Sequence, residues 1–149
     1  MRAVVQRVLR AEVSVAGEIV GRIGSGLCVL VGVGAEDAPA DADLLADKLV
    51  SLRIFEDGAG KMNLDLRETK GSLLAVSQFT LFGDVRKGRR PGFTGAMAPG
   101  PAEALFERCC ERIRGAGVQV EQGRFRTDMQ VSLVNDGPVT ILVDTKKSF

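Results

Sequence analysis

Two short motifs, about sixty residues apart, hold the residue types best suited to chemistry. The first, Ser77-Gln78-Phe79-Thr80, ends an apolar run, so hydroxyls, an amide and backbone N–H groups would gather where a strand breaks into a loop. The second, Asn135-Asp136-Gly137-Pro138-Val139-Thr140, places a Gly-Pro peptide inside another apolar segment. Proline has no N–H to give to a sheet, so this departure from the strand rules indicates a functional site.

The first motif allows two interpretations. It could be an ordinary strand end, in which Phe79 belongs to the core, or it could aim backbone N–H groups at a developing oxyanion. Thr80 as a nucleophile would need an activating base, and the chain contains no histidine. The same absence excludes Ser-His-Asp and Cys-His arrangements and His-ligated zinc. We therefore favour the backbone oxyanion site, which needs no such base.

The second motif and a basic loop leave further alternatives open. Asn135-Asp136-Gly137 is strong hairpin-turn chemistry, but Gly137-Pro138 could instead form a rigid cis peptide that presents two carbonyls. Arg86-Lys87-Gly88-Arg89-Arg90 is either a solvated loop or a surface that binds an RNA backbone by charge. The overall net charge of +1 does not decide between these last two interpretations.

The apolar periodicity shows which elements must position these residues. Strand patterns alternate with two helical patterns, and Pro39 and Pro101 suit the first turns of those helices. This order predicts a single α+β domain over residues 1–149, with a curled, barrel-like mixed β-sheet and two main helices. The predicted strands are a hairpin over residues 13–23 and strands over residues 27–33, 72–80, 118–121, 129–135 and 139–144, and the predicted helices are 39–53 and 101–115.

Composition adds limits on the class of protein. The chain of 149 residues, 45% hydrophobic, is long enough to bury one core without disulfides. Its cysteines, Cys28, Cys109 and Cys110, have neither a disulfide pattern nor the spacing of a metal site, so we expect them in the core. No apolar run is long enough to span a bilayer, and the first residues alternate instead of forming a signal peptide. We therefore expect a cytoplasmic protein without membrane contact.

Taken together, the motifs resemble those of the D-aminoacyl-tRNA deacylases, the chiral-proofreading enzymes of bacteria and eukaryotes. The resemblance extends from Met1 to about Val143 and is most specific in the Ser-Gln-Phe-Thr and Asn-x-Gly-Pro motifs. The other matching segments are Gln6-Arg7-Val8, Arg53-Ile54-Phe55, Lys61-Met62-Asn63-Leu64, Arg90-Pro91 with Phe93, Ala102-Glu103-Ala104-Leu105, Gly123-Arg124-Phe125 and Asp128-Met129-Gln130-Val131.

The resemblance implies a deacylase-like (DTD-like) fold and a homodimer with active sites at the subunit interface. Gly137 and Pro138, in the cis form, would enter the partner's pocket, where their carbonyls exclude an L side chain and tolerate a D side chain. Achiral glycine would also pass, which makes glycyl-tRNA a second substrate. No metal or organic cofactor is implied.

The implied reaction is hydrolysis of the ester that joins the amino acid to the 3′-terminal adenosine of tRNA. The substrate's own 2′-OH is our favoured assistant for the attacking water, and Thr80 as a covalent nucleophile is the alternative. A non-catalytic dimer that binds tRNA or another RNA on the same scaffold is the rival hypothesis. The resemblance assigns the pocket to Ser77, Gln78, Phe79 and Thr80, the adenosine bed to Ala102, Phe125 and Met129, and support of the Gly-Pro loop to Arg7.

Overall fold

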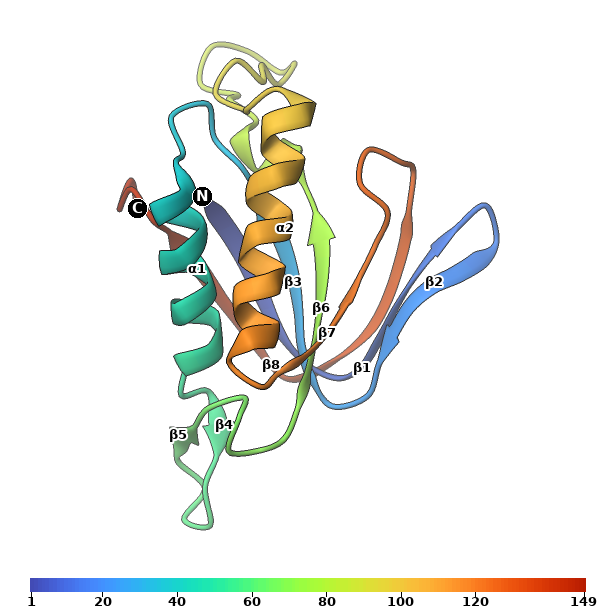
Figure 1. Cartoon of the computed structure of the whole chain (residues 1–149), viewed down its shortest axis with the longest axis vertical. Helices are drawn as coiled ribbons and strands as arrows, with labels where there is room; N and C mark the ends of the chain where they lie inside the picture. Colours follow the sequence, from blue (N-terminus) through green and yellow to red (C-terminus); the bar gives the residue numbers. More distant parts are fainter.

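Six strands form one mixed sheet, and two helices pack side by side against it (Figure 1). The computed structural model describes all residues from 1 to 149. The strands of the sheet are β1 (Arg2–Val15), β2 (Glu18–Ile23), β3 (Gly26–Gly32), β6 (Ser72–Ser77), β7 (Gln119–Gln122) and β8 (Gln130–Asp144). The other elements are α1 (Pro39–Ser51), α2 (Pro99–Gly115), the short pair β4 (Phe55–Glu56) and β5 (Met62–Leu64), and the 3₁₀ helix η1 (Phe79–Phe82).

The long strand β1 organises the sheet. It pairs antiparallel with β8 along one edge, and with β3 and then β2 along the other. Strand β6 lies parallel to β3, and β7 lies parallel to β6. The sheet then curls until β2 approaches β7, where a Cβ added to Gly21 would lie 2.8 Å from the carbonyl oxygen of Gln122. The predicted α+β architecture, with a curled mixed sheet and two main helices, is therefore confirmed.

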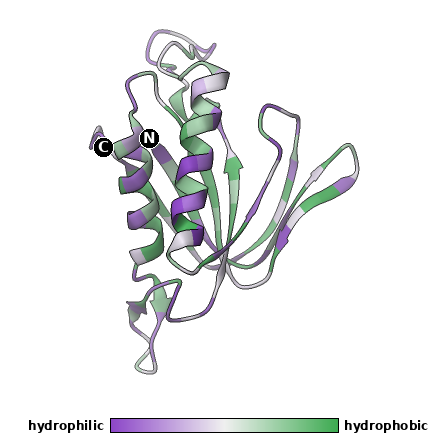
Figure 2. Cartoon of the chain, viewed as in Figure 1, coloured by the Kyte–Doolittle hydropathy of each residue, from purple (hydrophilic) through white to green (hydrophobic).

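The two faces of the curled sheet bury separate cores. The larger core lies between the sheet and the helices, and includes Val5 of β1, Leu27 of β3 and Leu45 of α1. A smaller cluster fills the inner side of the curl around Val13 and Leu74. Figure 2 shows largely hydrophobic strands behind helices whose hydrophilic segments face away from the sheet. All three cysteines are buried and free, as expected, and no helix has the length and apolar character needed to cross a membrane.

Four of the predicted elements differ clearly from the structure. The strand predicted over residues 72–80 ends at Ser77, because the chain turns into η1. The helix predicted from Pro101 begins two residues earlier, at Pro99. The two strands predicted at 129–135 and 139–144 are one continuous strand, β8, so the hairpin interpretation of the Asn-Asp-Gly segment is wrong. Residues 136–139 have no partner on β1, but pairing on both sides of them, at Asn135 and Thr140, keeps the chain on β1 instead of letting it turn back as a hairpin.

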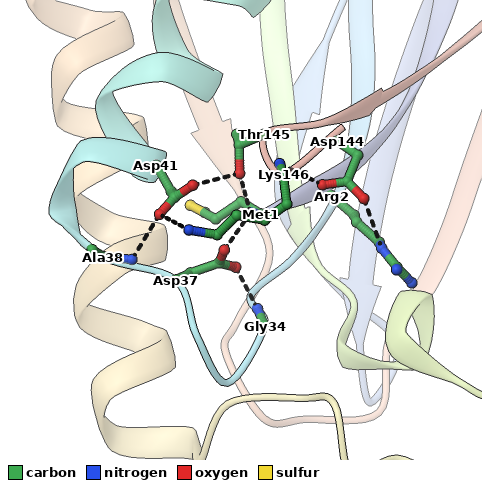
Figure 3. Close-up of polar contacts among 9 residues, drawn as sticks. All are labelled: Met1, Arg2, Gly34, Asp37, Ala38, Asp41, Asp144, Thr145 and Lys146. Atoms are coloured by element: carbon green, nitrogen blue, oxygen red, sulfur yellow. Dashed lines mark hydrogen bonds and ion pairs between the residues drawn. The ribbon is translucent and has the colours of Figure 1, made fainter. Parts of the chain in front are cut away.

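Asp41, in the first turn of α1, ties that helix to the residues that follow β8 (Figure 3). Its carboxylate accepts hydrogen bonds from the N-cap N–H of the helix, from Thr145 Oγ1 at 2.7 Å and from Lys146 Nζ at 2.9 Å. Burial raises the pKa of Asp41, but these hydrogen bonds outweigh it and lower the pKa to about 2. The carboxylate is therefore ionised and fully engaged at neutral pH.

Candidate functional site

The first motif lies at the carboxyl end of β6. Ser77 is the last residue of the parallel pairing with β3, opposite Val31, and the N–H of Gln78 donates to the Val31 carbonyl at 2.8 Å. The chain then leaves the sheet and forms η1. The parallel ladder thus fixes where the motif begins, and the 3₁₀ turn fixes how its backbone points.

Two glycines of the β3 end allow η1 to lie close to the sheet. A Cβ on Gly32 would lie 2.9 Å from the Gln78 carbonyl oxygen and 3.0 Å from Leu81 Cβ. A Cβ on Gly34 would lie 2.7 Å from the Phe82 ring. A side chain at either position would push η1 away from β3. The turn can lie this close to the strand because both residues are glycines.

Arg2 holds η1 from the neighbouring strand. Its Nη1 donates to the Leu81 carbonyl at 3.0 Å, and the guanidinium carbon lies 4.4 Å from the centroid of the Phe82 ring. Asp144 on β8 accepts from Arg2 Nε at 3.3 Å, a contact drawn in Figure 3. Strands β1 and β8 therefore help to fix the turn that carries the first motif.

The start of η1 carries backbone N–H groups that the turn itself does not use. Phe79 and Thr80 are the first two residues of the turn, so their N–H groups have no acceptor within it, and no side chain caps them. The Gln78 side-chain amide donates to the Thr80 hydroxyl. Phe79 is 58% exposed, and its ring meets the edge of Phe93 at a centroid distance of 5.0 Å. The interpretation of Phe79 as a core residue is therefore wrong.

A cavity of about 810 Å³ opens beside this strand end. Seventeen residues line it, eleven of them hydrophobic, which suits a flat organic group held by apolar contacts. Six of the residues predicted from the sequence lie together here, whereas Thr80, Arg7, Gly137 and Pro138 are not among the lining residues. The predicted residues in the lining are Ser77, Gln78, Phe79, Ala102, Phe125 and Met129.

Two further segments complete the apolar wall. Ala102 belongs to the first turn of α2 and is 7% exposed, so only its methyl group bounds the cavity. Phe125 follows β7 and packs against Phe106 of α2 at a centroid distance of 6.1 Å. Met129 lies over Gly123, where a Cβ would be only 2.6 Å from the methionine sulfur. The glycine therefore leaves the space that the Met129 side chain occupies.

The segment after the basic loop was not predicted to line the site; Phe93 was noted only as part of the family resemblance. The N–H of Met97 donates to the Val33 carbonyl at 3.0 Å, and the N–H of Ala35 donates to the Gly95 carbonyl at 2.9 Å. These bonds bring Phe93, Ala96 and Met97 against the cavity. The only signal in the sequence was isolated apolar residues within a loop rich in glycine and arginine.

Residues 126–128 were missed as well. Arg126, Thr127 and Asp128 form the charged and polar edge of the cavity, between Phe125 and Met129. No cluster of three or more metal-binding side chains is found in the structure.

The second motif lies in an irregular part of β8. Between Gln6 and Val8 of β1, the opposing residues run from Thr140 to Asn135, so β8 bulges outward there. The Gly137–Pro138 peptide within this bulge is cis. Both residues are exposed, and neither lines the cavity of its own chain.

Arg7 supports this bulge from beneath. The side chain is 5% exposed; Nη1 donates to the Ile54 carbonyl at 2.7 Å, and Nε donates to the Asp136 carbonyl at 3.1 Å. Gly137 has φ +124°, and a Cβ there would lie 2.9 Å from Val139 Cγ2, so only glycine fits without strain. The bulge is thus held in one conformation with its backbone presented outward.

Comparisons with known proteins agree with this geometry. Residues 4–144 match the family described as D-Tyr-tRNA(Tyr) deacylase. D-aminoacyl-tRNA deacylases of Symbiobacterium thermophilum and Anaeromyxobacter dehalogenans are 60% and 61% identical over 149 residues, covering all of this chain and 99% and 100% of those relatives.

Two solved structures share the fold. One, described as c-Myc DNA Unwinding Element Binding Protein, is 40% identical with a TM-score of 0.91 and covers 97% of this chain and 98% of that chain. The other, described as "a probable eukaryotic D-amino acid tRNA deacylase", is 21% identical with a TM-score of 0.83 and covers 95% and 97%. The resemblance drawn from the motifs is therefore confirmed, and the chain belongs to the D-Tyr-tRNA(Tyr) deacylase family.

Proposed function

We propose that this protein is a hydrolase that cleaves the ester bond of D-aminoacyl-tRNA. Water adds its oxygen to the acyl carbon, the ester C–O bond breaks, and the ribose oxygen of the tRNA takes a proton. Free D-amino acid and tRNA leave. The observation that carries the proposal is the cavity in which a strand end, followed by an uncapped 3₁₀ turn, meets an aromatic and apolar bed. Because its substrate is tRNA, we place the protein in the cytoplasm.

The cavity offers a separate place for each part of the substrate. The N–H groups of Phe79 and Thr80 would hold the carbonyl oxygen as negative charge develops on it, as an oxyanion site requires. Phe125 and Met129 would bed the terminal adenine, and the small side chain of Ala102 leaves room beside it. Ser77 and Gln78 complete the wall next to the scissile bond.

Activation of water is assigned to the substrate. The Thr80 hydroxyl already accepts a hydrogen bond from Gln78, and an amide N–H cannot remove its proton. The adjacent 2′-OH of the terminal ribose is therefore the group we propose as the assistant. A Thr80→Ala variant should keep most of its activity, whereas an ester on 2′-deoxyadenosine should be hydrolysed slowly. The reverse pair of results would assign the step to Thr80 as a nucleophile.

We assign rejection of L-amino acids to Gly137 and Pro138 of a second subunit. Within one chain neither residue lines the cavity of that chain, and Arg7 holds the adjoining Asp136 carbonyl in place. A selector made of backbone can reject a side chain by its direction without reading its identity. It would also let glycine pass, so glycyl-tRNA is a second proposed substrate.

The homodimer that this assignment needs is supported by the open face of the sheet. Val4 lies opposite Leu30 and Leu142 on neighbouring strands, which makes an apolar row on the face that the helices leave uncovered. Leu142 is 59% exposed. On the same face, Oε1 of Gln6 is buried without a hydrogen-bond partner in the chain. A second copy would cover the row and could supply the missing donor.

A matched pair of leucine variants tests the dimer. Leu142→Glu places a charge in the apolar row and should give a monomer by analytical ultracentrifugation, with loss of chiral selection. Leu44→Glu changes a leucine of α1 that is 47% exposed, and should leave both the oligomeric state and the selection unchanged. A dimeric Leu142→Glu protein, or a wild type that is monomeric at micromolar concentration, would contradict the proposed interface.

The basic loop is proposed as a docking surface for the tRNA backbone. Arg86 is paired with Asp84 at 2.6 Å, whereas Lys87, Arg89 and Arg90 form no ion pair in the chain. Phe93, which follows the loop, lines the cavity, so the free charges lie next to the proposed site. Contacts of this kind supply affinity without sequence preference, and their strength falls with salt.

The experiment that tests the function compares the decay of D-tyrosyl-tRNA, L-tyrosyl-tRNA and glycyl-tRNA with purified protein at catalytic concentration. We expect rapid loss of the D-tyrosyl and glycyl esters and no acceleration for the L-tyrosyl ester. Hydrolysis of both tyrosyl esters would keep the hydrolase and refute the Gly137-Pro138 selector. Unchanged esters together with saturable, salt-sensitive binding of tRNA would favour the non-catalytic RNA-binding protein instead.

A further inference from the structure

Arg126 is the single arginine among the residues that line the cavity. It is exposed, and its guanidinium forms neither a salt bridge nor a hydrogen bond within the chain. Several other exposed arginines are paired, including Arg22 with Glu12 at 3.0 Å and Arg108 with Asp43 at 2.8 Å. A free guanidinium at the edge of a mostly apolar cavity is available to a ligand.

The turn between β7 and β8 places this side chain. The Thr127 hydroxyl donates to the Arg124 carbonyl at 2.9 Å and closes the turn. Phe125 packs against α2, and the next residue, Arg126, has φ +61°, a left-handed conformation that is uncommon for residues with a Cβ. The chain therefore seats the ring of Phe125 and presents the charge of Arg126 at adjacent positions of one turn.

We infer that Arg126 binds a backbone phosphate of the tRNA acceptor strand, next to the adenosine bed of Phe125 and Met129. The inference rests on the proposed deacylase function and adds the residue that distinguishes a nucleotide chain from a lone aminoacyl-adenosine. The planar guanidinium carries paired N–H donors that match two phosphate oxygens. A terminal nucleotide carries its phosphate beside its base and ribose, as Arg126 lies beside the residues proposed to hold the base.

Asp128 sets the range over which this contact acts. Its carboxylate also lines the cavity and accepts no hydrogen bond from Arg126. Arg126 and Asp128 are the two charged side chains of the lining, so the net charge of the lining is zero. Long-range attraction at the cavity is therefore small, and Arg126 must act through direct contact. General attraction of the RNA is the proposed task of the basic loop, which makes the two contributions separable.

The test uses two substrates that differ in their phosphates. D-tyrosyl-tRNA carries the acceptor strand, whereas 3′-O-D-tyrosyl-adenosine carries no phosphate. Arg126→Gln should raise KM for D-tyrosyl-tRNA about tenfold with kcat unchanged. The same variant should hydrolyse the adenosine ester as the wild type does. The slope of log(kcat/KM) against log salt should become shallower by about 0.7, the value for one contact to a single strand.

Two variants control for charge and backbone. Arg126→Lys keeps the charge and should recover much of the loss on D-tyrosyl-tRNA. Lys70→Gln removes one positive charge from an exposed residue that also has a left-handed conformation, φ +55°. Lys70 precedes β6, whereas the cavity lies at the other end of that strand, so this variant should match the wild type on both substrates.

Three kinetic results would overturn the inference. In the first, Arg126→Gln loses activity equally on both substrates, which would show that Arg126 only shapes the turn. In the second, Arg126→Gln loses activity on neither substrate. In the third, Lys70→Gln shows the same loss on D-tyrosyl-tRNA as Arg126→Gln. Binding of the trinucleotide CCA, measured by titration calorimetry, decides the matter without turnover. A tenfold weaker Kd for CCA in Arg126→Gln supports the phosphate contact. If the wild type bound CCA but cleaved neither ester, the deacylase proposal alone would be refuted. An equal Kd overturns the inference.

Discussion

Gly32→Ala is the substitution that most directly tests how the first motif is positioned. The added Cβ would lie 2.9 Å from the carbonyl oxygen of Gln78 and 3.0 Å from Leu81 Cβ. Carbon atoms in ordinary contact are about 3.5–4.0 Å apart, so η1 would have to move away by about 0.5 Å. Gln78 contributes its backbone to the contact and cannot simply rotate aside, so the shift would reach Phe79 and Thr80.

The expected change in the free energy of unfolding follows from two opposing effects. Overfilling a well-packed site costs about 1–3 kcal/mol, and replacing glycine by alanine returns up to about 1 kcal/mol through the unfolded chain. We expect a net loss of about 1–2 kcal/mol in the free energy of unfolding, which lowers the urea midpoint by about 1 M at unchanged m-value. A 1 Å error in catalytic geometry costs about a hundredfold, so half of that shift should lower kcat/KM about tenfold.

The assay combines urea unfolding with decay of D-tyrosyl-tRNA. Gly24→Ala is the matched control, because a Cβ there meets nothing within 4 Å. It should keep full activity and unfold at the same or slightly higher urea concentration. Equal activity of Gly32→Ala and Gly24→Ala would refute the idea that close packing on β3 sets the geometry of η1.

Further predictions concern stability and reactivity. The lowered pKa of Asp41, about 2, means that its interactions stabilise the fold above pH 4 and are lost as the pH falls from about 4 to 2. Asp41→Asn should therefore lower the free energy of unfolding by about 2 kcal/mol at pH 6, and the difference from wild type should shrink below pH 3; a difference independent of pH would contradict this sign. Leu45→Ala removes a fully buried side chain of α1 and should cost about 2–5 kcal/mol by urea unfolding, while a loss under 1 kcal/mol would mean that the helix does not close the core. Burial raises the pKa of all three cysteine thiols, so an aromatic disulfide reagent at pH 8 should label none quickly, and should label three after unfolding.

The parts of the fold that the sequence predicted well are those set by local patterns. Alternation of apolar residues predicted the hairpin over residues 13–23, and Ala16 and Gly17 at its turn have positive φ values of 50° and 80°. The helical pattern over residues 39–53 identified α1, whose Leu45 and Leu49 are fully buried. The pattern around Gly137 failed because turn residues were judged without β1, whose pairing with β8 at Asn135 and Thr140 confines them to a bulge within one strand.

The residues of the candidate site likewise divide into those that a local pattern predicts and those that depend on contacts between distant segments. Ser77 and Gln78 could be located because they end a recognisable strand, whereas Phe125 and Met129 entered through the family resemblance. Met97 had only the weak signal of an isolated apolar residue in a loop, and Arg126 had none. Met97 reaches the cavity through a backbone bond to Val33, sixty-four residues earlier, and Arg126 reaches it through a turn that depends on packing against α2. Contacts between distant segments of this kind carry no period that a sequence pattern can reveal.

The separation of the two motifs has a physical reason. The proposed oxyanion site needs donors fixed to a fraction of an ångström, and close packing of η1 on Gly32 and Gly34 would hold them so. A steric selector must stand opposite those donors, on the far side of the substrate. One chain that supplied both walls would close over the cavity, whereas a selector on a partner leaves the site open until two copies meet. Gly137 and Pro138 are exposed and absent from the lining of their own cavity, and Arg7 holds the adjoining Asp136 carbonyl, which is the arrangement that the proposed selector on a partner subunit would require.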